Sequence, residues 1–383
     1  MRRAETILAA LLCVPALAQE IPPFTSAEQT LRVGEDESRI WWESREFDRA
    51  LRNRGHLLGD AALDGYLQEI AESLYPEFRG IVRLRAVRDP QLNAFALPNG
   101  SLYIHIGLIG RADNEAQLAT VIAHEAAHFV HRHGLRQRRS LKGSAAAASI
   151  AGLAGGIGGL LGQLAAISSV YGYSRDLERE ADRQGFERLN AAGYSVAEGV
   201  KIFETLETEA KLLEIKEPYM FSSHPRMRER IESFRELSAK ASSDGRTETA
   251  RFLERAAPAR IAWLEAELAW GRHKSLIHQL GREGAAERFP SWFEYYRGEA
   301  LVLRGEAGDA QSAEAAFRRA IAAAPQFAPS YRSLGVLLMK RSDHGAAKAM
   351  LMRYLELAPD AADTAYVRGY LERIEAALRE PGS

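Results

Sequence analysis

The sequence predicts a mainly α-helical protein, in which an α+β domain with a small sheet is followed by an α-helical repeat domain. Three observations predict this fold class. Apolar residues recur at helical spacing in the segment 28–75 and again after residue 174. Strand-like alternation occurs between residues 81 and 109. Finally, Pro325 and Pro359 are 34 positions apart, which is the period of a tetratricopeptide unit.

Length and charge restrict the possibilities further. The chain has 383 residues, enough for two domains, and its hydrophobic content of 46% is typical of globular proteins. The net charge is only -1, which argues against a nucleic-acid partner, because such a surface needs a basic excess. We expect one domain at 28–237, a polar linker at 238–249 and the repeat domain at 250–383.

The first eighteen residues have the features of an export signal. A basic start, "MRRAE", precedes the apolar run "TILAALLCVPALA", and Ala16-Leu17-Ala18 is a small-x-small cleavage site. A retained membrane anchor is the alternative, although the apolar run is short for a membrane span. The only cysteine, Cys13, lies inside this segment. Residues 1–18 therefore predict a signal peptide, and a mature chain without disulfides suits a bacterial periplasm.

The N-terminal domain begins with helical patterns and then changes period. The stretch "LDGYLQEIAESLY" at 63–75 places its large apolar side chains on one helix face. "IVRLRAV" at 81–87 alternates apolar and basic residues. Two further β-prone runs, "LNAFAL" and "SLYIHIGLI", flank the turn Pro98-Asn99-Gly100, a strong hairpin signal. We therefore predict a small three-stranded sheet.

A helix is predicted next, with Asn114 as its N-cap, Gln117 three residues later and Gly134 as its stop. It contains "VIAHEAAHFVHRHG" at 121–134. His124 and His128 are four apart, so their imidazoles point to the same side and can share one ion. The alternative is two surface histidines. The apolar flanks argue against it, because buried imidazoles need partners.

Glu125 lies beside these histidines, turned about 100° around the helix from His124. This is the H-E-x-x-H arrangement of zinc peptidases, in which the glutamate stands next to a metal-bound water. His131 lies about 10 Å along the axis from His124, too far to share the ion. We interpret His131 and His133 as ordinary residues of the helix end. His105 is interpreted as facing the sheet.

A zinc site of this type needs a third protein ligand, which "SRDLEREADRQG" at 174–185 can supply. Glu178 can bind the ion. Asp182 lies one turn later. It can accept a hydrogen bond from a ligating histidine, through the ring nitrogen that is not bound to the metal. The alternative is an acid-rich solvated helix in which Arg179 and Glu180 form surface ion pairs.

The stretch 143–173 contains no charged side chain and many glycines. We interpret it as a glycine-broken helical hairpin that covers the site as a lid. A membrane-crossing or membrane-contacting segment is the alternative.

The C-terminal repeats are predicted from residue types at fixed positions, with a plain helical bundle as the alternative. The first unit fits only if a few residues are inserted near Gly308. The matching positions are Ala313, Phe317, Ala320 and Pro325 in the first unit, and Tyr331, Leu334, Gly335, Leu338, Ala347, Leu351, Tyr354 and Pro359 in the second.

"HEAAH", the later "EREAD" and the upstream "NAFALPNGSLYIHIGLI" together resemble the HtpX/Ste-type gluzincin metallopeptidases, peptidase family M48, over residues 55–235. The signal peptide and helical repeats are similar to those of the BepA-like periplasmic group. The resemblance implies one Zn²⁺ on His124, His128 and Glu178, with Glu125 as general base and Asp182 supporting a ligand. It also points to His224, in "SSHPRMRERI", as a regulatory fourth ligand.

The resemblance further implies unfolded or misassembled polypeptides as substrates, and contact with outer-membrane assembly machinery through the repeats. Two other functions stay open. One is a tetratricopeptide scaffold or chaperone with a latent metal site, and the other is a membrane-embedded protease that crosses the bilayer at 143–173. The presence of Glu125 favours a peptidase, because a scaffold has no need of a base beside the ligands.

Overall fold

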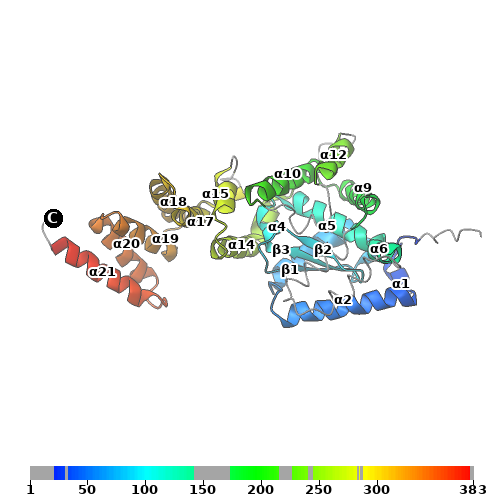
Figure 1. Ribbon diagram of the computed structural model, residues 1–383, viewed down its shortest axis with the longest axis horizontal. Helices are drawn as coiled ribbons and strands as arrows, with labels where there is room; N and C mark the ends of the chain where they lie inside the picture. Colours follow the sequence, from blue (N-terminus) through cyan, green and yellow to red (C-terminus); the bar gives the residue numbers. More distant parts are fainter. Residues whose placement is uncertain are drawn as a thin grey trace, which may run out of the picture.

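The computed structural model describes residues 21–30, 33–141, 173–214, 227–239, 245–282, 284 and 288–379. The predicted fold class is confirmed: helices surround one small sheet, and further helices extend toward the C-terminus (Figure 1). The predicted signal peptide at 1–18, the uncharged stretch except Tyr173, and His224 lie outside the described residues. Within the described part of the chain, no helix is both long enough and apolar enough to cross a membrane.

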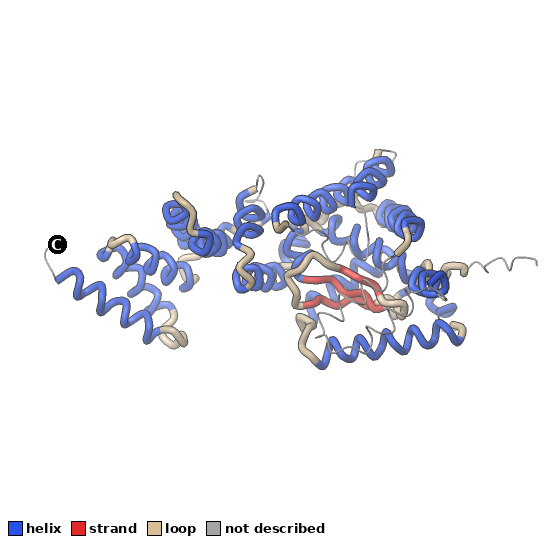
Figure 2. Tube along the Cα trace, viewed as in Figure 1, coloured by secondary structure: helices blue, strands red, loops and turns tan. Residues whose placement is uncertain are grey.

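The sheet has three strands in the order β1-β3-β2, drawn in red in Figure 2. They are β1 (Arg83–Val87), β2 (Ala94–Ala96) and β3 (Ser101–His105). The predicted hairpin is present, since β2 and β3 pair antiparallel, and Gly100 adopts a positive φ of 82° in the turn. Strand β1 pairs with β3 in parallel, so β3 is the central strand, and β1 and β2 form the two edges of the sheet.

The N-terminal helices pack around this sheet. The helix predicted within 63–75 is α3, and its apolar face is buried as expected. Asp60 caps α3 by accepting from the backbone N–H groups of Ala62 and Leu63 at 3.0 Å. The helices of this part are α1 (Ala27–Thr30), α2 (Glu35–Asn53), α3 (Ala61–Leu74), the 3₁₀ turn η1 (Pro76–Phe78), α4 (Ile106–Arg111), α5 (Glu115–Val130) and α6 (His133–Leu141).

Helix α5 begins as predicted and ends earlier than predicted. The Asn114 side chain accepts a hydrogen bond from the Gln117 backbone N–H at 3.0 Å, which confirms the N-cap. The prediction that Gly134 stops the helix is wrong. The helix ends at Val130, and the left-handed residue is Arg132, with φ of 54°. The Arg132 guanidinium pairs with the Glu37 carboxylate, and this long-range contact holds the unusual backbone in place.

Three helices cover the far side of α5: α9 (Arg175–Ala191), α10 (Ala197–Leu212) and α12 (Met227–Ser238) (Figure 1). Helix α9 approaches α5 closely at Gly185. A Cβ atom there would lie 3.1 Å from the backbone nitrogen of His124. Gly185 is seven residues after Glu178 and on the same helix face. The missing side chain therefore lets α9 bring Glu178 close to α5.

The apolar core continues beyond the predicted linker. Trp263 and Leu264 belong to the same buried cluster as the sheet, and a second cluster begins at Leu301. The division of the chain at 238–249 stays a prediction. The helices that follow it are α13 (Thr249–Arg255), α14 (Ala257–Ala269), α15 (His273–Gly281), the 3₁₀ turn η2 (Ser291–Phe293), α17 (Glu294–Arg304), α18 (Asp309–Ala323), α19 (Ala328–Lys340), α20 (His344–Leu357) and α21 (Thr364–Arg379).

The last five helices follow one another as a row of hairpins, shown from yellow to red in Figure 1. Most of the residues that predicted tetratricopeptide units are buried between them. These include Phe317 of α18, Leu334 of α19 and Leu351 of α20. The assignment to that repeat type stays a prediction.

Replacing Gly110 by alanine should destabilise the protein. A Cβ atom at Gly110 would lie 2.2 Å from the Trp263 ring, so α4 and α14 would have to separate. Overpacking of this kind costs about 1–3 kcal/mol of unfolding free energy, which urea denaturation measures. Gly65→Ala is the matched control, because a Cβ atom added at that helical position would have no atom of another segment within 4 Å. A Gly110→Ala variant as stable as the parent would contradict the contact.

The stability of the fold should depend on pH through His105. This imidazole is buried in β3, and burial lowers its pKa to about 4, although Asp89 at 3.8 Å acts in the opposite direction. The unfolded chain binds a proton at about pH 6.5, so it holds more protons than the folded chain between these two values. Stability should therefore fall as pH decreases from about 6.5 to 4. Urea denaturation at several pH values measures this dependence. The unfolding free energy of a His105→Gln variant should fall less steeply with decreasing pH than that of the parent. If the two plots of unfolding free energy against pH are parallel, His105 is not the cause.

Candidate metal centre

Two imidazoles from α5 and one carboxylate from α9 converge at one point. The Nε2 atoms of His124 and His128 are 3.0 Å apart. Glu178 lies opposite them, with Oε2 at 3.6 Å from His124 Nε2 and Oε1 at 3.5 Å from His128 Nε2. Ligand atoms around a tetrahedral zinc ion are about 3.3 Å apart. The spacing of these three groups therefore fits a single divalent cation.

The surroundings of these three groups also favour a cation. His124 is fully buried, His128 is 2% exposed and Glu178 is 4% exposed. Glu125, the neighbour of His124 in α5, is 1% exposed. Groups of this polarity are costly to bury without a partner of opposite charge. Two nitrogen donors and one carboxylate oxygen form the donor set of zinc hydrolases that keep one coordination position open.

The second nitrogen of His124 is held by a buried ion pair. His124 Nδ1 lies 2.9 Å from Asp182 Oδ1, on the same face of α9 as Glu178. Arg230 of α12 donates to the same carboxylate at 2.8 Å. Burial alone would lower the pKa of Arg230, but the nearby Asp182 and Glu178 carboxylates raise it, so the guanidinium stays charged. Asp182 therefore orients His124 with its Nε2 toward Glu178.

Arg230 was not identified from the sequence. It lies in "SSHPRMRERI", the segment that was singled out for His224, which is outside the described residues. An arginine in a charged amphipathic helix carries no signal by itself, because such side chains are usually solvated. Only the packing of α12 against α9 brings it to Asp182.

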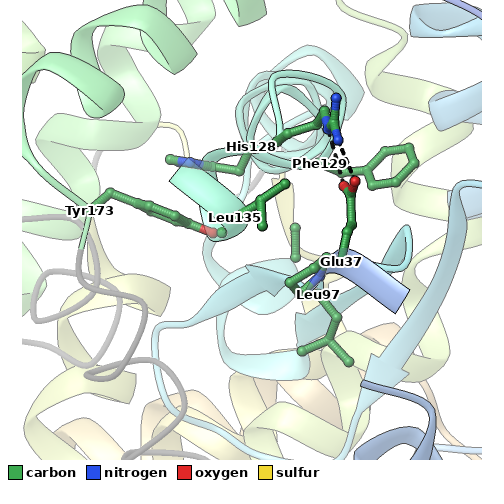
Figure 3. Close-up of a pocket in the computed structure, with 10 residues that line it drawn as sticks. Glu37, Leu97, His128, Phe129, Leu135 and Tyr173 are labelled. Atoms are coloured by element: carbon green, nitrogen blue, oxygen red, sulfur yellow. Dashed lines mark hydrogen bonds and ion pairs between the residues drawn. The ribbon is translucent and has the colours of Figure 1, made fainter. Parts of the chain in front are cut away.

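His128 has a different environment, shown in Figure 3. Its ring stacks on Tyr173, with centroids 3.9 Å apart and planes 13° from parallel. Both residues line a cavity of about 10 Å³ that also touches Ala96 and Leu97 at the end of β2. The edge strand β2 and His128 therefore border the same small space. Tyr173, the last residue of the uncharged stretch, had no sequence signal as a site residue.

His131 is the C-cap of α5, as interpreted, but the interpretation of His133 as an ordinary residue of the same helix end is wrong, because the chain turns at Arg132. His133 begins α6, is fully buried and places its Nδ1 atom 2.9 Å from His128 Nδ1. His131 Nδ1 lies 2.9 Å from Glu180 Oε1. Glu180 also accepts from Arg136 at 2.8 Å. Glu180 therefore faces α6, where its carboxylate lies against His131, His133 and Arg136.

Residues 60–238 match the sequence profile described as peptidase family M48. The beta-barrel assembly-enhancing protease of Escherichia coli K12 is 25% identical over 246 residues, which cover 58% of this chain and 50% of that protein. A Vibrio cholerae serotype O1 protein, provisionally named as the same protease, is 32% identical over 243 residues, covering 58% of this chain and 49% of that one.

A third relative is covered more completely. The protein called metalloprotease YcaL, from Escherichia coli K12, is 30% identical over 179 residues, which cover 45% of this chain and 69% of that one. The chain spans about half the length of the two assembly-enhancing relatives. In all three comparisons less than two thirds of this chain is aligned.

Proposed function

The chain belongs to peptidase family M48, and from this premise we propose that it is a periplasmic, zinc-dependent endopeptidase of unfolded or misassembled proteins. The observation that carries the proposal is the convergence of His124, His128 and Glu178 on one point. Two relatives named for beta-barrel assembly support a role in outer-membrane protein quality control. In this proposal the C-terminal helices are tetratricopeptide-like and dock clients or assembly partners.

In the proposed site, His124, His128 and Glu178 hold one Zn²⁺, and Asp182 fixes the ring of His124. A bound zinc ion supplies a Lewis acid that polarises a water molecule and the substrate carbonyl. The carboxylate of Glu125 accepts the proton that the attacking water loses, and then donates it to the nitrogen of the leaving amine. The burial of Glu125 keeps this proton transfer away from bulk water.

The edge strand gives the substrate a place to bind. Among the described strands, β2 pairs only with β3, and Leu97 at its end lines the same cavity as His128. An extended peptide can add to such an edge through backbone hydrogen bonds, which tolerate many side chains. That tolerance suits a protease that cleaves unfolded chains of varied sequence.

A second function stays open, in which the chain is a tetratricopeptide scaffold or chaperone with a latent metal site. The small cavity beside His128, about 10 Å³, and the burial of the three groups favour it. The retained Glu125 favours the peptidase, since a scaffold needs no base beside the metal.

Digestion of casein by the purified full chain separates the two functions. We expect casein fragments without chelator, intact casein with 1,10-phenanthroline, and fragments again after zinc is restored. Intact casein under all three conditions would overturn the endopeptidase proposal. Fragments that form equally well with chelator would show that the cleavage does not depend on this metal.

A further inference from the structure

We propose that His133 is a positioning residue of the metal site, which links His128 to the carboxylate of Glu180. In this arrangement His128 donates its Nδ1 proton to His133 Nδ1, and the other nitrogen of His133 faces Glu180. The inference rests on the proposed function, because it assumes that His128 binds the ion through Nε2.

The geometry allows one arrangement of protons. His128 Nε2 faces Glu178 and His124, so as a ligand it carries a lone pair, and the proton of its neutral ring is on Nδ1. That Nδ1 is 2.9 Å from His133 Nδ1, which must then accept. The proton of His133 is consequently on Nε2, 3.5 Å from Glu180 Oε2. Along the series from His128 through His133 to Glu180, each donor nitrogen therefore faces an acceptor atom.

His133 is buried where it contacts His128. The side chain of His133 has no solvent-accessible surface. Its ring is 4.9 Å from the ring of His128 and 76° from parallel. A buried imidazole is therefore fixed against the second nitrogen of a ligand.

The two ligating histidines then have parallel supports from α9. Asp182 accepts from His124 directly and is paired with Arg230. Glu180 reaches His128 only through His133, and is paired with Arg136. The segment "EREAD" thus supplies a ligand at 178 and two supporting carboxylates. Hydrogen bonds to the free nitrogen of a ligand fix its tautomer and ring orientation, and raise its basicity.

The same residues could be read as a second cation site. His131, His133 and Glu180 each offer one donor atom, and these atoms lie within 4.8 Å of one another. Two features oppose that reading. The Arg136 guanidinium, 2.8 Å from Glu180 Oε2, already supplies the positive charge. A cation on His133 Nε2 would also move the ring proton to Nδ1 and remove the acceptor that His128 needs.

Zinc affinity of the full chain tests the proposal, measured by competition with a chromophoric chelator. His133→Leu should weaken zinc binding about 10–100-fold, the usual cost of losing a supporting partner. His133→Asn should restore most of the affinity, because its amide oxygen can take the place of Nδ1. Glu180→Gln should weaken binding by a smaller factor. His273→Leu, in α15, is the matched control and should bind as the parent does.

A second measurement is the visible absorption spectrum of Co²⁺ bound at the site, which depends on how the ligands are arranged around the ion. In the cobalt-substituted chain, His133→Leu should shift the visible absorption bands, and His133→Asn should return them toward those of the parent. A change confined to folding would alter the melting temperature without this rescue. If His133→Leu does not fold, the affinities of His133→Asn and Glu180→Gln decide, since loss in the first or none in the second would contradict the relay.

Failure of the relay and failure of the metal site give different results. Parental zinc affinity in a folded His133→Leu variant would overturn the role of His133 and leave the site intact. Two tightly bound zinc ions per chain, with the second lost in His131→Ala, would also overturn it in favour of the second cation site. A parent chain that binds no zinc would instead remove the proposed function.

Discussion

Glu125→Gln is expected to reduce casein hydrolysis by about 10²–10⁴-fold while the chain still binds zinc. The substitution keeps the size of a fully buried side chain and removes its ability to accept a proton. The three groups that would hold the ion are not altered. Initial rates of casein cleavage, together with zinc content per chain, measure both parts of the expectation.

The two measurements must be read together. A variant that has lost both zinc and activity would say nothing about the base, so the zinc content acts as the internal control. Parental cleavage by a zinc-loaded Glu125→Gln chain would exclude Glu125 as the general base. The proposed ligands would then need a different proton acceptor.

Glu178→Gln is expected to remove most of the zinc affinity and, with it, the activity. The neutral amide oxygen is a weaker donor than a carboxylate, and the two imidazoles 3.0 Å apart would lose the Glu178 carboxylate, which faces both Nε2 atoms. Zinc should also stop stabilising the fold. In the parent, zinc at 100 times its dissociation constant adds about 2.7 kcal/mol of unfolding free energy.

Chelator competition and melting curves with added zinc measure these effects. Glu187→Gln is the matched control, because Glu187 is an exposed residue of the same helix whose carboxylate pairs with Arg183. It should bind zinc like the parent. Parental zinc affinity in Glu178→Gln would mean that the third ligand is another group, and the arrangement proposed here would be wrong.

Local sequence patterns were sufficient to predict many elements of this fold. The face of α3, the hairpin at Asn99-Gly100 and the Asn114 cap each depend on residues only a few positions apart. The pairing of His124 with His128 is equally local, since helix geometry alone places them together. Glu178 is about fifty positions away, and the sequence connected it to them only through the types of residue present and the family resemblance.

Contacts between distant segments explain what the sequence did not predict. The end of α5 was misplaced because Arg132, held by Glu37, takes the turn that glycine usually takes. That error hid His133, which reaches His128 only because the chain turns there. Arg230 was missed for a similar reason, as its partner Asp182 is 48 positions away.

The core that continues past the predicted linker has a consequence for shortened forms of this protein. Arg111 of α4 pairs with Glu209 at 3.0 Å and with Glu267 of α14 at 3.2 Å, and its guanidinium lies over the Trp263 ring. A truncation after residue 237 would strip away Glu267 and Trp263 and expose the apolar surface beneath them to water. Such a fragment would be prone to aggregate, so recombinant work on the peptidase half should retain at least α13 to α17.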